Sequence, residues 1–380
     1  MSITRDALQT GLQRSALAFR GYNTTNIGRS QELLAHPAYG PTVRQFLTRG
    51  SAIASDATGR VIDLVDRVEQ QQETALETYS DAISLIVSME LAQLELLQQF
   101  FGIDYQLANL MYGYSLGEIS AVIAGGAHAI EGPLSVLLKL ADDAVELAHD
   151  VTLGVLFSRG PALSMAAVQG ECLRINNAGQ GVVDVSAYLS PNSLLIMGQN
   201  DTLDRLKAAL EQTFSHRVYL RKNKDSWPPM HTCIVWERSI SNRAAVMMHT
   251  IPGGFEPTRP DVFSLVTGRV EYRDHTTRDV LCRWIDHPQR LWDAVYETLK
   301  RGLETVIHVG PAPNLIPATF ERLRVDVEGQ TRGSIGMRAL SNIIRRPWLS
   351  AILPSRTALL RAPHVQHLIL ENWLLEQTIA

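Results

Sequence analysis

A serine between two glycines is the strongest candidate for a reacting group in this chain of 380 residues. Residues 113–117 read Gly-Tyr-Ser-Leu-Gly, a G-x-S-x-G pattern centred on Ser115. The apolar run at 107–112 predicts a strand before it, and 118–124 predict a helix after it. Such a turn exposes the serine and aims the first N–H groups of the helix at a developing oxyanion. The pattern predicts nucleophilic catalysis by Ser115, and a serine that only caps the helix is the alternative.

A nucleophilic serine needs a base, and histidine is the usual one. His231 is the best candidate among the eleven histidines, because it follows Pro228 and Pro229 where the chain should return from an inserted subdomain. A histidine in a surface loop with no catalytic role is the alternative interpretation.

The elements around these residues indicate an α/β fold with a parallel sheet, because short apolar strands alternate with helical segments. Strands are expected at 15–19, 107–112, 262–266 and 305–309, and helices at 60–100, 118–124, 134–147 and 290–301. We expect the core to comprise residues 1–159 and 230–320.

Residues 160–229 hold several short strand-like runs close together, which predicts a small β-rich subdomain of the split βαβ kind. Strands are expected there at 163–168, 194–197 and 216–220, with a helix at 201–212. Residues 321–380, with a helix at 364–376, are expected to form a helical C-terminal extension packed on the core.

Composition excludes several classes of protein. With 45% hydrophobic and 19% charged residues, the chain should fold around a core and not be fibrous or disordered. Its 35 Lys and Arg against 39 Asp and Glu make nucleic acid an unexpected partner. Cys172, Cys233 and Cys282 have neither disulfide-framework nor metal-site spacing. With no leader-like or membrane-spanning apolar run, we expect a cytoplasmic protein with no membrane contact and no metal.

Residues 113–126 resemble the G-H-S-L-G-E signature of malonyl-CoA:acyl-carrier-protein transacylases and of the acyltransferase domains of polyketide and fatty-acid synthases. Further segments resemble that family in the same order, over roughly residues 15–318: they are 18–21, 190–198, 229–231, 286–288 and 308–311. The family fold is an α/β-hydrolase-like core with a ferredoxin-like inserted subdomain. This agrees with the β-rich segment expected between Ser115 and His231.

The resemblance implies a role for each matching residue. Ser115 would take the acyl group from a thioester, and His231 would be the base that later activates a phosphopantetheine thiol. A main-chain carbonyl near Trp284 would orient the histidine, and the N–H groups of Leu116 and Tyr22 would form the oxyanion hole. The substrate would be an acyl-CoA or phosphopantetheine thioester, the partner an acyl-carrier protein, and no cofactor would be tightly bound. Oligomeric state is not indicated.

Departures from the family pattern concern the acyl group. The arginine that clamps a malonyl carboxylate falls, by ungapped count, on Leu140, and leucine cannot bind a carboxylate. The adjacent Lys139 would point about 100° away on a helix. Tyr114 replaces the histidine before the nucleophile, so Tyr114 and Leu140 are expected to line a pocket for an acyl group without a free carboxylate. Glu118 is expected to be structural and to stabilise the turn.

Because carrier proteins are acidic, a basic surface should lie near the site. Arg217, Arg221, Lys222 and Lys224 are the first candidates, and an ordinary solvated loop is the alternative. A second candidate surface is carried by Arg338, Arg345, Arg346, Arg356 and Arg361.

Three functions are compatible with these residues. The first is acyl transfer to a carrier-protein thiol through an acyl-serine intermediate. The second is hydrolysis of acyl thioesters, in which water accepts the acyl group. The third is a non-catalytic scaffold that binds a carrier protein.

Overall fold

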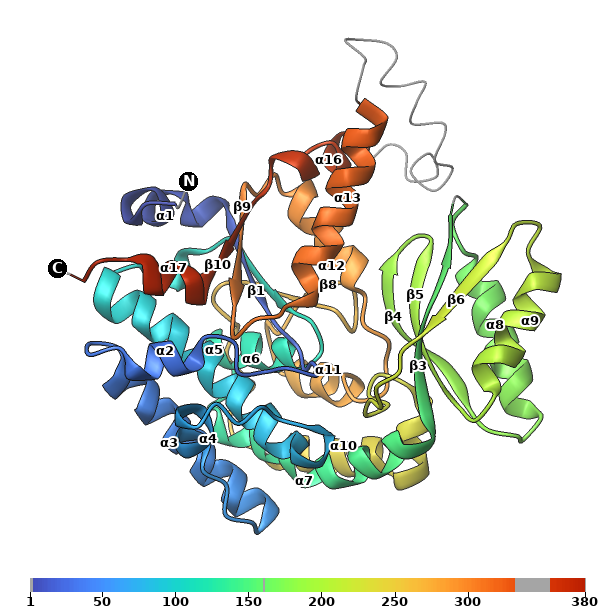
Figure 1. The fold of residues 1–380 in the computed structure, drawn as a ribbon, viewed down its shortest axis with the longest axis horizontal. Coiled ribbons are helices and arrows are strands. Elements are labelled where there is room, and N and C mark those ends of the chain that lie inside the picture. The colour runs from blue at the N-terminus through green and yellow to red at the C-terminus, as the bar shows by residue number, and fades with distance from the viewer. Residues whose placement is uncertain (1–2, 160, 332–355, 380) are drawn as a thin grey trace.

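The computed structural model describes residues 3–159, 161–331 and 356–379. The chain forms a main domain built on one sheet and a smaller subdomain built on another, and the two lie side by side (Figure 1). Within the described residues, no helix is both long and apolar enough to cross a membrane.

The main sheet has six strands in the order β10-β9-β1-β2-β7-β8. Their bounds are β1 Ser15–Phe19, β2 Leu110–Gly113, β7 Val262–Ser264, β8 Arg269–Glu271, β9 Thr305–Val309 and β10 Gln366–Ile369. Neighbouring strands run parallel except β8, which is antiparallel to β7. Parallel strands place their carboxyl ends at one edge, so the loops after β1, β2 and β9 meet there.

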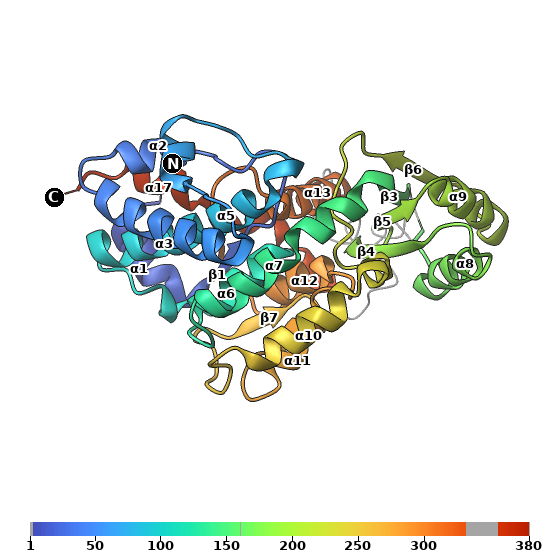
Figure 2. The same cartoon turned by 90° about the horizontal axis from the view of Figure 1, so that it is seen from below.

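Alternate residues of β1 face two different hydrophobic clusters, as expected for a strand between two helical layers. Leu17 and Phe19 pack with the layer that contains α3, α5, α6 and α7. Ala16 and Ala18 face the layer of α12, α13 and α16. Figure 2 shows α3, α5 and α7 beside one another along the first layer.

The helices of the main domain follow in chain order. They are α1 Arg5–Gly11, α2 Ser30–Ala35, α3 Gly40–Thr58, α4 Leu64–Glu69, α5 Tyr79–Phe101, α6 Leu116–Ala124, α7 Glu131–Leu147, α10 Ile240–Thr250, α11 Thr277–Arg283, α12 Leu291–Lys300, α13 Leu315–Thr331, α16 Arg356–Leu359 and α17 Leu370–Glu376.

The small subdomain has an antiparallel sheet in the order β4-β5-β3-β6. Its elements are β3 Val151–Ser158, α8 Met165–Asn177, β4 Val183–Ser190, β5 Ser193–Gln199, α9 Thr202–Thr213 and β6 Val218–Lys222. This βαββαβ order is ferredoxin-like. Both helices pack on one face of the sheet, where Leu156, Val168 and Leu206 share a core. The opposite face is turned toward the main domain (Figure 1).

The expected fold class is confirmed, but several elements differ. The expected strand at 163–168 is wrong, because Ser164 caps α8 by accepting the N–H of Ala167 at 3.3 Å, and Val168, Cys172 and Ile175 form a buried helical stripe. Strands β3 and β4 were not expected. Because β3 begins at Val151, the small subdomain starts there and not at residue 160.

The single helix expected at 60–100 is also wrong. Asp63 caps the short α4 through the N–H groups of Val65 and Asp66, and the chain then leaves helical geometry at Gln71, whose φ is 53°. A new helix, α5, begins at Tyr79. The polar residues between 69 and 75 therefore separate two helices, although the helical spacing of apolar residues at 85–97 predicted one continuous helix.

The C-terminal region differs from a purely helical extension. The expected helix at 364–376 is a strand followed by a shorter helix, β10 and α17. β10 pairs in parallel with β9, with Leu368 opposite Ile307, so this region completes the main sheet.

Candidate active site

Ser115 lies on a tight turn between β2 and α6. Its φ of 53° and ψ of −119° are rare for a residue with a side chain. A Cβ on Gly113 would lie 2.0 Å from the carbonyl carbon of Gly117, and one on Gly117 would lie 2.4 Å from the main-chain oxygen of Phe19. The two glycines of the G-x-S-x-G pattern are therefore required by close backbone packing.

The loop after β1 lies directly against this turn. A Cβ on Gly21 would be 2.6 Å from the main-chain oxygen of Tyr114 and 3.3 Å from Cβ of Ser115. This close approach places Tyr22, the next residue, at the wall of the cavity that contains Ser115. Leu116, the other expected oxyanion residue, is the first residue of α6. Main-chain N–H groups at this helical position have no partner within the helix.

A buried arginine holds the loop after β1 in place. The Arg20 guanidinium donates to the main-chain oxygens of Gly21 and Pro311 and to Oδ1 of Asn26, at 2.6–2.9 Å. The Arg20 N–H donates to the buried Glu90 carboxylate at 2.8 Å. Burial lowers the pKa of Arg20 to about 10 and raises the pKa of Glu90 to about 8. Sequence reasoning assigned Arg20 no role, because its partners come from distant parts of the chain.

Ser115 and His231 form a direct contact. The Ser115 Oγ lies 2.7 Å from Nε2 of His231, and Nδ1 of the same ring lies 2.7 Å from the main-chain oxygen of Trp284. A carbonyl oxygen only accepts, so the Nδ1 proton belongs to this bond and Nε2 is left with a lone pair toward the serine hydroxyl. The carbonyl is that of Trp284, the residue named from the sequence.

Burial controls the titration of His231. The residue is 3% exposed, and desolvation lowers the pKa of its imidazole to about 4 despite the Trp284 hydrogen bond and the attraction of Asp286. The imidazole is therefore neutral at pH 7, which is the form that accepts a proton.

Gln289 is a buried residue that sequence reasoning missed. Its Oε1 accepts the N–H of Ser115 at 3.2 Å, and its Nε2 lies 3.3 Å from Nδ1 of His231. Since the Nδ1 proton is directed at Trp284, the second approach is a contact between two N–H groups and not a hydrogen bond. Gln289 directly follows the 286–288 segment quoted above, but no pattern singled it out.

Glu118 lies beneath the turn and not in the cavity. It accepts the hydroxyl of Tyr272 at 2.6 Å and the N–H of Leu265 at 3.0 Å. Burial raises its pKa to about 7. These bonds connect α6 to the region around β7 and β8, in keeping with the structural role expected for Glu118.

Ser115 opens into a cavity of about 310 Å³. Tyr114 and His231 line it together with three aromatic side chains, those of Tyr22, Tyr79 and Trp227. The Tyr22 ring centroid lies 4.8 Å from that of Tyr79 and 5.6 Å from that of Trp227, both edge to face. The opposite wall is the helix-free face of the small sheet, which contributes Leu153, Val155, Leu195 and Met197.

Leu140 does not line this cavity, which corrects the expected pocket. It lies on α7 against a separate small void shared with Leu116, Met230 and Trp284. Lys139 is exposed. The residue reached by the ungapped count therefore borders a different void, whereas Tyr114 lines the Ser115 cavity as expected.

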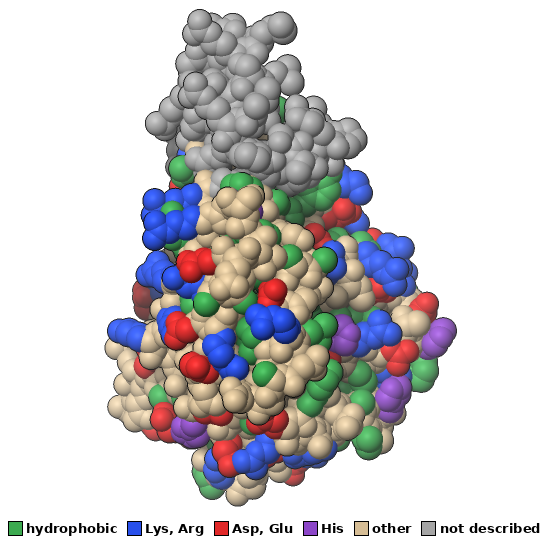
Figure 3. All heavy atoms as spheres, turned by 90° about the vertical axis from the view of Figure 1, so that its right-hand side faces the viewer, with side chains coloured by type: hydrophobic (Ala, Val, Ile, Leu, Met, Phe, Trp, Pro, Cys, Tyr) green, Lys and Arg blue, Asp and Glu red, His purple; other side chains and the backbone are tan. Residues whose placement is uncertain are grey.

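The expected basic surface is divided between the two faces of β6. Lys222 is paired with Asp204 at 2.6 Å on the side of α9, whereas Arg221 lines the Ser115 cavity. The Arg217 guanidinium carbon lies 5.0 Å from the ring centroid of Tyr219. Lys224 is exposed in the loop after β6. On the outer face of the small subdomain, basic and acidic side chains are interspersed (Figure 3).

The second expected surface is described only in part. Arg338, Arg345 and Arg346 lie outside the described residues, and Arg356 begins α16. Arg361 donates to the main-chain oxygen of Leu299 at 2.8 Å, at the end of α12. The described part of the chain contains no group of three or more His, Cys, Asp or Glu that could hold a metal ion.

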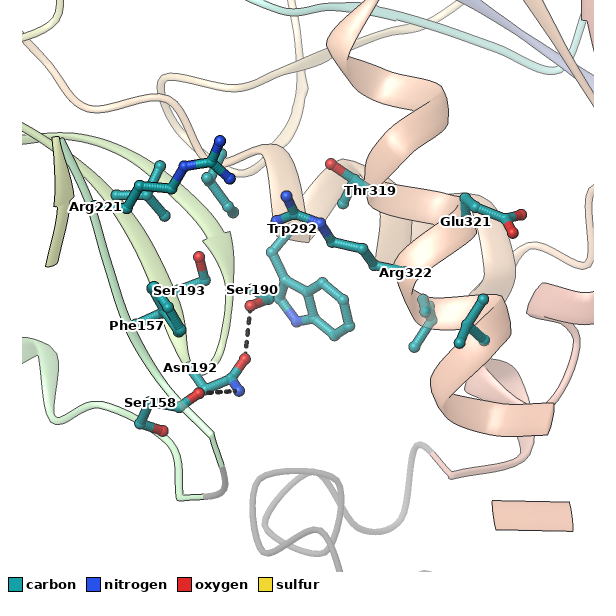
Figure 4. A pocket seen from close by; sticks show the side chains of 14 residues that line it. Phe157, Ser158, Ser190, Asn192, Ser193, Arg221, Trp292, Thr319, Glu321 and Arg322 are labelled. Carbon is teal, nitrogen blue, oxygen red and sulfur yellow. Dashed lines mark hydrogen bonds between the residues drawn. The ribbon is translucent and has the colours of Figure 1, made fainter. Parts of the chain in front are cut away.

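A second cavity, of about 490 Å³, continues outward from the first between the small sheet and α13 (Figure 4). The two cavities share the lining residues Val155, Leu189, Arg221, Thr319 and Arg322. Arg221 comes from β6 and Arg322 from α13, so the two arginines stand on opposite walls where the cavities meet. Figure 4 shows both side chains directed into the space between the walls.

The described carboxylate nearest these arginines in the cavity lining is already paired. Glu321 also lines the outer cavity, but it forms an ion pair with Arg324 at 2.6 Å, and that bond lowers the pKa of Glu321. Among the described residues, neither Arg221 nor Arg322 has an ion-pair partner. Two unpaired cations on opposite walls favour an anion between them.

Comparison with known proteins places this geometry in a recognised fold. No protein-family model matches the chain. The polyketide synthase GfsA of Streptomyces halstedii is 22% identical over 318 residues, a match that covers 78% of this chain but only 4% of the synthase.

Two solved structures have the same architecture. The malonyl-CoA:acyl carrier protein transacylase (FabD) of Xanthomonas oryzae is 20% identical with a TM-score of 0.61, over 82% of this chain and 91% of that one. A malonyl-transacylase in complex with its type II polyketide-synthase acyl-carrier protein, PlMCAT:AntF, is 20% identical with a TM-score of 0.59, over 80% and 91%. The chain therefore has the fold of the malonyl-CoA:acyl-carrier-protein transacylases, an α/β-hydrolase-like core with a ferredoxin-like subdomain.

Proposed function

We propose that this protein is an acyltransferase that moves an acyl group from a thioester to a phosphopantetheine thiol through an acyl-Ser115 intermediate. The observation that carries the proposal is the 2.7 Å contact between Oγ of Ser115 and Nε2 of His231, with the opposite ring nitrogen bonded to a carbonyl. That arrangement leaves a neutral base facing a nucleophile on a turn built to expose it.

In the first half-reaction, Oγ of Ser115 attacks the thioester carbonyl while Nε2 of His231 takes the hydroxyl proton. The carbonyl oxygen becomes an oxyanion, which accepts hydrogen bonds from the N–H groups of Leu116 and Tyr22. The C–S bond then breaks, and the leaving thiolate takes the proton from His231. The products are acyl-Ser115 and a free thiol.

In the second half-reaction, a phosphopantetheine thiol gives its proton to Nε2 of His231 and its sulfur attacks acyl-Ser115. The oxyanion of this second tetrahedral intermediate accepts hydrogen bonds from the same N–H groups. When the C–O bond breaks, Oγ regains the proton from His231. The base is the same in both directions, which suits a group exchanged between two thiols of similar chemistry.

We propose that the acyl group carries no free carboxylate. The wall near Ser115 and His231 is formed by Tyr22, Tyr79, Tyr114 and Trp227, and the cations that line the cavity are at its outer end. A carboxylate near Ser115 would be desolvated without a guanidinium to pair with it.

We further propose that Arg221 and Arg322 receive the phosphate of the phosphopantetheine arm, whether it belongs to coenzyme A or to an acyl-carrier protein. A guanidinium binds phosphate oxygens in pairs, and these two lie where the inner cavity opens outward. We also propose that Arg217 and the exposed Lys224, which flank β6, attract an acidic carrier protein toward the small subdomain.

The test measures where the acyl group goes. Purified protein is incubated with acetyl-CoA, malonyl-CoA and octanoyl-CoA, with and without a carrier protein bearing phosphopantetheine. The amounts of acylated carrier protein and of free acid are then measured. Acetyl or octanoyl transfer that exceeds malonyl transfer, and that is lost in Ser115→Ala, is expected. Free acid formed equally fast without carrier would indicate a thioester hydrolase, and carrier binding without turnover would indicate a scaffold.

A further inference from the structure

We propose that Gln289 is a positioning residue that connects the small subdomain to the Ser115–His231 pair and holds the His231 ring as the neutral base. This inference rests on the proposed function, because it assigns His231 the role of base.

The main chain of Gln289 is bonded to the edge of the small sheet. Its N–H donates to the main-chain oxygen of Ser186 at 2.8 Å, and its carbonyl accepts the N–H of Tyr188 at 2.8 Å. These bonds form a parallel bridge between Gln289 and Ala187 of β4. Gln289 is also fully buried. Because these main-chain bonds join it to β4, a shift of the small subdomain on the core would move this residue.

The side chain of Gln289 reaches both reacting residues. Its Oε1 accepts the N–H of Ser115 at 3.2 Å, and only an oxygen can accept there, so the orientation of the amide is fixed. Its Nε2 must then face the imidazole ring, 3.3 Å from Nδ1 of His231. One buried amide therefore spans the main chain of the nucleophile and the ring of the base.

The orientation of this amide has an electrostatic consequence. The Nδ1 proton of His231 is already directed at the Trp284 oxygen, so the positive N–H end of the Gln289 amide faces a ring nitrogen that has no lone pair to offer it. A second proton on the ring would make an imidazolium beside that positive end. The amide thus disfavours the charged ring. Asp286 acts in the opposite direction, but its carboxylate accepts hydrogen bonds from Trp236 and His287.

Three variants test the inference. Gln289→Leu removes the amide dipole at similar volume. Gln289→Glu keeps an acceptor for the Ser115 N–H and places a carboxyl group near the ring. Gln93→Leu is the matched control, since Gln93 is another buried glutamine whose Oε1 accepts a main-chain N–H, that of Gly310 at 2.8 Å, away from His231.

The readout is the pKa of His231, measured by NMR titration of ring-labelled histidine in the intact chain and assigned with His231→Asn. We expect the pKa to rise in Gln289→Leu and to rise further in Gln289→Glu, by about 1–3 pH units, while Gln93→Leu leaves it unchanged. The pH at which single-turnover acylation of Ser115 falls in acid should rise by the same amount as the His231 pKa. If Gln289→Leu does not fold, Gln289→Met, which also lacks the amide, takes its place, because a rise in Gln289→Glu alone would follow from the added carboxyl charge.

An unchanged His231 pKa in both Gln289 variants, or an equal rise in Gln93→Leu, would overturn the inference. Its failure can be told apart from that of the proposed function. If the expected pKa order appears but no acyl-enzyme forms, the acyltransferase proposal fails while the effect on the ring stands. If acyl-enzyme forms and the pKa does not move, only the role of Gln289 is lost.

Discussion

The main-chain oxygen of Trp284 lies 2.7 Å from Nδ1 of His231, in the place where Ser-His-Asp triads put a carboxylate. The indole N–H of Trp284 donates to the main-chain oxygen of Ser115 at 2.8 Å, so one residue holds both members of the pair. A carbonyl orients the ring as a carboxylate does, but it stabilises an imidazolium less. Burial lowers the pKa of His231, and the carbonyl raises it too little to offset that effect.

The first prediction concerns the pH dependence of acylation. Neutral His231 is the active form, and burial places its pKa at about 4, so acylation should fall only as pH drops toward 4 and not near 6.5. Single-turnover acylation of Ser115 between pH 4 and 8, with short exposures, measures this limb. A limb centred at 6.5 would mean that the ring is solvated during the reaction.

The stability of the fold should also decrease in acid, but it should begin to do so at a higher pH than acylation does. The unfolded chain binds a proton on His231 near pH 6.5, but the folded chain does so only near 4, so stability is complete above 6.5 and declines as pH falls from 6.5 to 4. This group alone contributes a loss on the order of 2 kcal/mol between pH 7 and 5. Urea unfolding at both pH values checks it. His231→Asn should lose less stability over that interval than the unmodified chain.

A third prediction tests the close packing of the turn. Gly117→Ala places a Cβ 2.4 Å from the main-chain oxygen of Phe19 and should destabilise the fold by about 2–4 kcal/mol and abolish acylation. Gly170→Ala is the control, because Gly170 lies within α8 with open space around its Cβ position, so it should be neutral or up to about 1 kcal/mol stabilising. Urea unfolding compares them, and equal effects would contradict the packing argument.

A fourth prediction concerns the two arginines between the cavities. In Arg221→Ala/Arg322→Ala, acylation by acetyl-CoA should weaken at least tenfold in kcat/KM, while acylation by acetyl-pantetheine, which has no phosphate, should change little. The control, Arg174→Ala/Arg205→Ala, removes two arginines that are paired with Glu171 and Asp201 and line neither cavity. It should keep the preference for the phosphorylated donor.

The opposite dependence would be informative. If Arg221→Ala/Arg322→Ala instead removed a preference for malonyl-CoA over acetyl-CoA, the arginines would bind the acyl carboxylate. The proposal of an uncharged acyl group would then be wrong.

The parts of the site that were predictable are local in sequence. The turn at Ser115 follows from two glycines, an apolar strand and a helix within fifteen residues. The strand expected at 163–168 failed because a short apolar run fits a helix as well as a strand, and only Ser164 marks the start of α8. Sequence position alone also misled for Leu140, which lies on α7 behind the turn.

Other parts depend on contacts between distant residues. Gln289 meets Ser115 across 174 positions, and the Arg20 guanidinium meets Pro311 across 291. Neither pairing leaves a periodic or spaced pattern, because it is produced by the parallel sheet that brings separate loops to one edge. The sequence indicates Arg221 as a docking residue. That Arg322 faces the same cavity from the opposite wall follows only from the position of α13 beside the small sheet.

The most direct test of the central claim is the mass of the intact protein after incubation with acetyl-CoA and octanoyl-CoA, with peptide mapping of the modified residue. Our account predicts an adduct of one acyl group on Ser115, absent in Ser115→Ala and strongly reduced in His231→Asn, that disappears when a carrier protein bearing phosphopantetheine is added. No adduct with these donors or with malonyl-CoA, or an adduct that persists in Ser115→Ala, would contradict it.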